Sequence, residues 1–182
     1  GNKGKEQKLV YLPSARNKIV DKPLELQFNN NPYSIKEIFG EKNLKQVHRT
    51  LVAVEHFYNI GNVLVLCDKP DTAEKYVKNL IEYNEKNSFL ENISDDSDIK
   101  YAIDLIEKED SGENLLIDGL KYGVVYHHAR ISNNIKDLIE ILIKRGLVKV
   151  VFATTTLAQG MNFPIKSIVF DFLWWNNYGK HY

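Results

Sequence analysis

The chain has 182 residues, of which 43% are hydrophobic and 26% are charged, as in an ordinary globular protein. This length is enough for one α/β domain with a full core and an extension. Basic and acidic residues balance at 24 each, so composition alone gives no reason to expect a nucleic-acid partner. The single cysteine, Cys67, excludes an internal disulfide, and the sequence has neither a signal peptide nor an apolar stretch of about 18 residues. We therefore expect a cytoplasmic protein with no membrane partner.

The apolar pattern predicts strands that alternate with helices. Short apolar or alternating runs predict strands over residues 9–12, 24–28, 63–67, 123–128, 148–153 and 167–172. Apolar residues at spacings of three and four predict helices over residues 44–58, 71–84, 99–109, 115–120 and about 132–144. Such alternation is typical of βαβ units. We therefore expect an α/β fold with a mostly parallel sheet and helices on both faces.

Charge is unevenly distributed along the chain. Residues 84–120 carry eleven acidic and three basic residues, whereas residues 121–170 carry seven basic and two acidic residues. We interpret the acidic segment at about 84–120 as an insertion ahead of the next strand, either a solvated surface or a segment that docks a partner. A neutral average can therefore hide a basic face, and only the local field matters for contacting phosphates.

Two polar blocks follow apolar runs at the ends of predicted strands. The first is Tyr126-His127-His128-Ala129-Arg130, and the second lies within Val-Val-Phe-Ala-Thr-Thr-Thr-Leu-Ala-Gln-Gly-Met-Asn-Phe-Pro, residues 150–164. In open α/β sheets, ligands bind just outside the carboxyl ends of the strands. The paired histidines could suggest a metal, but no cysteine or second histidine pair stands at ligand spacing, so we expect no metal site.

These two blocks resemble motifs of the second motor domain of superfamily 2 helicases, closest to the DExH branch that unwinds RNA for the exosome or DNA during repair. The match over Leu157–Pro164 is long, and the resemblance covers roughly residues 20–175. It implies a RecA-like three-layer domain. It also implies that residues 1–40 are a linker and remnant leading from the first motor domain. Residues 41–182 would then be the helicase C-terminal domain, truncated before the last motif.

The resemblance also implies which residues contact single-stranded RNA or DNA. Thr154 stands where the family bonds a backbone phosphate, with Thr155 beside it, and His128 and Ala129 belong to the motif on the adjacent strand. Relatives usually carry glycine at the position of Arg130, which could either meet a phosphate or be a solvated surface residue. Lys69 follows another strand, where the family's fourth motif is weakly matched, and could serve as a point charge. The sequence does not distinguish RNA from DNA.

The resemblance places Gln159, Gly160 and Asn162 at the ATP cleft, which a first RecA-like domain of the same chain would complete. ATP and Mg²⁺ would bind there in the full-length protein, which we expect to be an ATP-dependent helicase. The sequence contains no Gly-x-x-x-x-Gly-Lys-Ser/Thr loop and no final arginine motif, so we assign it no catalytic residue. We expect no cofactor and no ATP hydrolysis by these residues alone.

Two other functions remain possible from the sequence. The first is a degenerate helicase domain that docks nucleic acid or protein and has lost the motor cycle. The second is a small-molecule enzyme on a nucleotide-binding fold, which would need a glycine-rich first turn that this sequence lacks.

Overall fold

The computed structural model describes residues 46–109, 114–154 and 163–171, which all lie within one compact unit, residues 33–182. Helices and strands alternate in this part of the chain, as the apolar pattern predicts. Its helices are α2 (Gln46–Tyr58), α3 (Pro70–Asn87), α4 (Ser97–Glu109), α5 (Asn114–Leu120) and α6 (Asn133–Lys144). Its strands are β1 (Val63–Cys67), β2 (Val124–His127), β3 (Val150–Thr154) and β4 (Ser167–Phe170).

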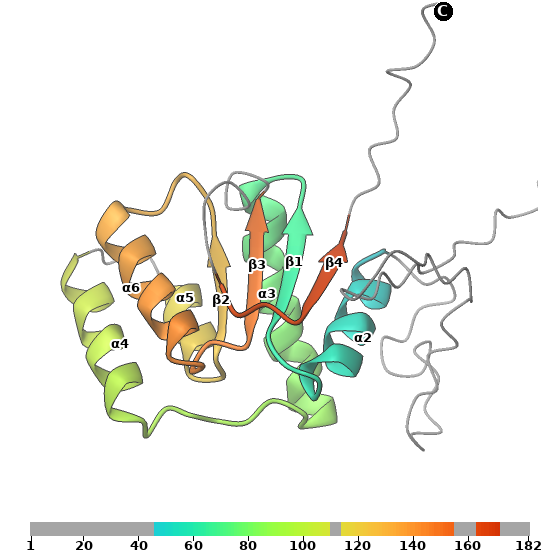
Figure 1. Ribbon diagram of the computed structural model, residues 1–182, viewed down its shortest axis with the longest axis horizontal. Coiled ribbons are helices and arrows are strands. Elements are labelled where there is room, and N and C mark those ends of the chain that lie inside the picture. The colour runs from blue at the N-terminus through green and yellow to red at the C-terminus, as the bar shows by residue number, and fades with distance from the viewer. Residues whose placement is uncertain (1–45, 110–113, 155–162, 172–182) are drawn as a thin grey trace, which may run out of the picture. The chain divides into compact units, whose positions relative to one another are not determined.

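The strands form one four-stranded parallel sheet in the order β2-β3-β1-β4 (Figure 1). Every residue of β1 and β3 is buried, because a strand inside a parallel sheet is covered on both faces. At β4, Val169 is buried, whereas Ile168 and Phe170 are 53% and 60% exposed. One face of the sheet is therefore open to solvent at β4.

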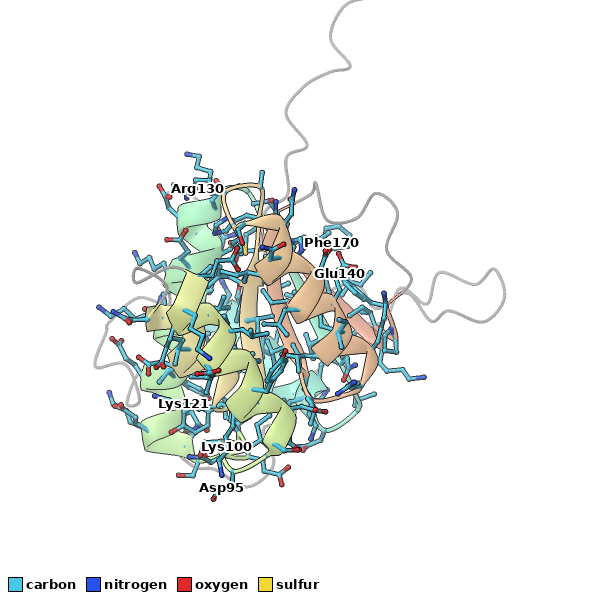
Figure 2. The ribbon with its side chains drawn as sticks, turned by 90° about the vertical axis from the view of Figure 1, so that its left-hand side faces the viewer. Asp95, Lys100, Lys121, Arg130, Glu140 and Phe170 are labelled. Atoms are coloured by element: carbon cyan, nitrogen blue, oxygen red, sulfur yellow. The ribbon has the colours of Figure 1, made fainter. Side chains whose placement is uncertain are left out.

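Helices cover both faces of the sheet. Helix α3 contacts β1, β2 and β3 from one face, and its neighbours α2 and α5 contact β1, β4 and β2. Helix α6 lies across the sheet from α3 (Figure 2). The chain runs one way along the sheet from β1 to β2 and back from β2 to β3, so right-handed crossovers place α3 and α6 on opposite faces. The predicted RecA-like α/β architecture is confirmed.

The acidic segment folds into helices that belong to the core. Helix α4 begins where Asp96 Oδ1 accepts hydrogen bonds from the N–H groups of Asp98 and Ile99, at 2.8 and 3.3 Å. Arg145 donates to Asp98 at 2.6 Å, which ties α4 to the end of α6. The apolar side chains of α4 and α5 that become buried are Ile99, Ala102, Ile106, Leu116, Ile117 and Leu120.

Some element bounds differ from the prediction. Helix α3 extends past residue 84 to Asn87, and Ser88, whose φ of 52° is left-handed, caps it with an N–H that donates to the Asn84 carbonyl. Strand β3 starts two residues late because the Val148 N–H bonds to the Leu142 carbonyl in the preceding turn, at 3.4 Å. The strands predicted over 9–12 and 24–28 lie outside the described residues. No helix in the described ranges has the length and apolar character to cross a bilayer.

Candidate nucleic-acid interface

The carboxyl ends of the parallel strands meet at one edge of the sheet, at the top of Figure 1. In the register, Cys67 of β1 pairs with Thr154 of β3, and His127 of β2 pairs with Ala153. The turns after β1 and β2 begin at this edge. The sheet therefore brings together a set of predicted site residues that we call the strand-end edge: Lys69, His128, Ala129, Arg130 and Thr154.

Local sequence explains how the two turns form. Lys69 has an extended backbone and precedes Pro70, which suits the first position of α3 because it needs no N–H there. The Thr72 hydroxyl donates to Asp68 at 2.7 Å and closes the turn. After β2, the Ser132 hydroxyl accepts from the Ile135 N–H at 3.3 Å and caps α6. Each turn thus leads from a strand end directly into a helix.

The two histidines at the end of β2 are both buried, with exposed fractions of 7% for His127 and 3% for His128. His128 lies against α3, since its Nε2 is 2.9 Å from Glu74 Oε1. Its ring stacks on Tyr126 with centroids 5.2 Å apart. Adjacent residues of a strand face opposite sides, so His127 lies on the α6 side, where Lys136 acts on it electrostatically.

Arg130 is exposed but is engaged by carboxylates of α3. Its guanidinium donates to Asp71, in the first turn of the helix, and lies 3.5 Å from Glu74. The hydrogen bond from Arg130 holds the pKa of the Asp71 carboxyl below its ordinary value. His128 and Lys69 also act on Asp71 electrostatically and lower its pKa further, so these groups share one region of the edge.

The predicted site residues divide by exposure. Lys69, Ala129 and Arg130 are exposed, whereas His128 and Thr154 are buried, Thr154 with an exposed fraction of 8%. The exposed residues can meet a ligand directly. The predicted residues Thr155, Gln159, Gly160 and Asn162 lie outside the described residues.

Three residues at this edge were missed in the sequence: Asp71, Glu74 and Lys136. Lys136 Nζ donates to the Ala129 carbonyl at 3.3 Å, and the two acids hold Arg130. The one signal in the sequence was Arg130 itself, because a cation beside two strand ends attracts a counter-ion. Its partners are 56 and 59 residues away in sequence, so no spacing rule identifies them.

No protein-family model matches the chain. Curated relatives match part of it: 48% identity over 52 residues with Superkiller complex protein 2 of Mus musculus, and 36% over 76 residues with Antiviral helicase SKI2 of Saccharomyces cerevisiae. ATP-dependent DNA helicase Hel308 of Thermoplasma volcanium is 30% identical over 109 residues. These matches cover 29%, 40% and 60% of this chain but only 4%, 6% and 14% of the relatives. Homologues of this chain are thus Ski2-like DExH RNA helicases and the Hel308 DNA helicase, and its RecA-like domain is related to superfamily 2 helicases.

Proposed function

We propose that this chain is the second motor domain of an ATP-dependent helicase and that its strand-end edge grips the backbone of one RNA or DNA strand. The observation that carries the proposal is the convergence of Lys69, His128–Arg130 and Thr154 on one edge of a parallel sheet. Backbone contacts use cations, hydroxyls and N–H groups and carry no sequence information, which suits a protein that moves along a strand.

ATP and Mg²⁺ belong to the same proposal. The ATP cleft would be lined by Gln159, Gly160 and Asn162 and completed by a first RecA-like domain of the intact protein. The intact protein would act in the cytoplasm. The names of relatives include ATP-dependent RNA and DNA helicases, which supports a nucleotide-driven motor. The three cleft residues lie outside the described residues, and we assign the nucleotide no contact in the described part of the chain.

Strand affinity of the intact protein tests the assigned edge. Lys69→Ala removes an exposed cation there, so it should weaken binding of labelled single-stranded RNA or DNA several-fold at low salt. The slope of log affinity against log salt should fall by about 0.7, the value for one phosphate contact on a single strand.

Lys121→Ala is the matched control. Lys121 lies at the opposite end of the domain from Arg130 (Figure 2) and pairs with Asp118 at 2.8 Å. Equal losses for the two variants would contradict the assigned edge. Strand binding by the intact protein without strand-stimulated ATP hydrolysis would instead favour a degenerate docking domain.

A further inference from the structure

The turn after β2 is fastened to both flanking helices by side chains. On one side, Glu74 of α3 approaches both the buried His128, at 2.9 Å, and the exposed Arg130, at 3.5 Å. On the other side, Lys136 of α6 donates to the Ala129 carbonyl at 3.3 Å. The orientation of Arg130 is therefore set by α3, through Glu74 and the stronger contact with Asp71.

Asp71 and Glu74 present to Arg130 the same chemistry that a nucleic-acid backbone would present. A guanidinium binds the paired oxygens of a carboxylate or of a phosphate through the same planar fork of donors. Asp71 and Glu74 both contact the guanidinium through Nη2, so a phosphate that approaches this nitrogen meets the negative charge of two carboxylates. A phosphate that binds the fork through Nη2 must therefore displace Asp71.

The displacement is feasible because the pair is exposed. The side chains of Arg130 and Asp71 are 55% and 79% exposed, and ion pairs in such surroundings are weakened by water and salt. The exposed end of Arg130 also lies at the edge where the strands end (Figure 2). Asp71 thus contacts the guanidinium of Arg130 but leaves it exposed to solvent.

We propose that Asp71, supported by Glu74, is an internal competitor for the strand phosphate at Arg130, so that binding exchanges a carboxylate for a phosphate. This inference rests on the proposed function of the strand-end edge. Because Asp71 competes with the phosphate, the affinity for the strand is lower than it would be without the Asp71 carboxylate. The exchange also breaks the contact between Arg130 and Asp71, which is one of the contacts that hold the turn after β2 to α3, whereas the contact of His128 with Glu74 does not depend on it.

The test is Asp71→Asn in the intact protein, which keeps the shape of the side chain and removes its charge. Affinity for a labelled single-stranded oligonucleotide at low salt should rise several-fold. The slope of log affinity against log salt should steepen by up to about 0.7, because Arg130 becomes free to release one more counterion. Circular dichroism and thermal melting confirm that each variant is folded.

Asp104→Asn is the matched control, since it removes the same charge from an exposed pair with Lys108 on α4. It should change affinity little. In an Arg130→Ala background, Asp71→Asn should have no larger effect than this control. A gain equal to that of Asp104→Asn, or a gain that persists without Arg130, would overturn the inference.

The outcomes separate this inference from the proposed function. If the wild-type protein binds the strand and Lys69→Ala weakens binding, the strand-end edge stands. Failure of Asp71→Asn to tighten binding then overturns only the competition at Arg130. If the wild-type protein binds no strand at low salt, both proposals are overturned.

Discussion

His127 is a buried imidazole whose chemistry is set by its surroundings. It is 7% exposed, and neither ring nitrogen has a hydrogen-bond partner among the described residues. Burial lowers its pKa to about 4, and the nearby charge of Lys136 acts in the same direction. A charged imidazole is therefore excluded from this position at neutral pH.

We predict that this histidine makes stability depend on pH. Between about pH 6.5 and pH 4 the unfolded chain binds a proton at His127 that the folded chain does not, so the free energy of unfolding falls as pH decreases. Relative to His127→Gln, which does not titrate, the loss should approach about 3 kcal/mol at the acidic end of this window. Urea unfolding of both proteins across the window measures the difference, and parallel pH profiles would contradict the assignment.

A second prediction at this scale concerns Thr154, the last residue of β3, which pairs with Cys67 and is 8% exposed. In the intact protein, Thr154→Val should impair strand affinity and strand-stimulated ATP hydrolysis more than folding. Valine keeps the shape but removes the hydroxyl, a loss of roughly 0.5–3 kcal/mol that depends on the charge of the partner. Melting temperature and strand affinity are measured on the same preparation. A variant that melts early yet binds normally per folded molecule would show that Thr154 only stabilises the turn.

The residues of the strand-end edge could be predicted only in part. Lys69, Arg130 and Thr154 were predicted from the resemblance to helicase motifs, and the apolar runs before them predict that they lie at strand ends, which meet at one edge of a parallel sheet. The partners of Arg130 were not found, because contacts between a strand-end turn and a helix depend on the packing of the whole sheet. Pairings across 56 and 59 residues leave no local pattern.

Among the elements, α5 shows how closely a helix is packed on the sheet. A Cβ atom added to Gly119 would lie 2.4 Å from the Val124 carbonyl oxygen at the start of β2, and 3.0 Å from Val77 of α3. Backbone cannot move aside as the end of a flexible side chain can. Glycine here permits the approach of α5 to the strand.

We predict that Gly119→Ala destabilises the domain, although alanine is the better helix former by about 1 kcal/mol. The steric conflict with β2 should lower the free energy of unfolding by roughly 1–3 kcal/mol, as overpacking does elsewhere. Asp118→Ala is the control on the same helix, because Asp118 is exposed and makes only a surface pair with Lys121. If Gly119→Ala proved as stable as the wild-type protein, helix propensity would outweigh the close approach.

Helices and strands were predicted best where the apolar period is strong. The pattern that predicts a helix over 99–109 is confirmed by α4, which buries Ile99, Ala102 and Ile106. Ile135, Leu138, Ile139 and Leu142 share the apolar spacing of α6, but Leu138 is only half-buried, whereas the other three are buried. Periodicity shows which face is apolar, but not how far the neighbouring layer extends over it. That extent depends on tertiary packing, which the sequence pattern does not contain.

At the scale of the whole molecule, Asp171 joins three elements around β4. Its side chain accepts hydrogen bonds from the hydroxyls of Thr50 on α2, at 2.7 Å, and of Tyr76 on α3. Its N–H donates to the Leu66 carbonyl of β1 at 3.0 Å. Asp171 is 8% exposed, so its carboxylate has lost most of its contact with water. The two hydroxyl donors replace the hydrogen bonds that water would make.

Tyr76 extends the same connection to β3. Its ring stacks on Phe152 with centroids 5.4 Å apart and an interplanar angle of 4°. Burial raises the pKa of its phenol, and the hydrogen bond to Asp171 raises it further, so the hydroxyl keeps its proton. One side chain thus couples α3 to both a central strand and an edge strand of the sheet.

We predict that the two hydroxyls stabilise the domain jointly. Tyr76→Phe keeps the ring stack and Thr50→Val keeps the shape, so each variant removes only one donor. Each should lower the free energy of unfolding by roughly 1–3 kcal/mol, the range for a hydrogen bond to a charged group. The double variant leaves the buried carboxylate with neither hydroxyl, so it should cost more than the sum of the single losses. Urea unfolding of the three variants measures this coupling. Losses that are small and strictly additive would show that Asp171 does not link α2 and α3 energetically.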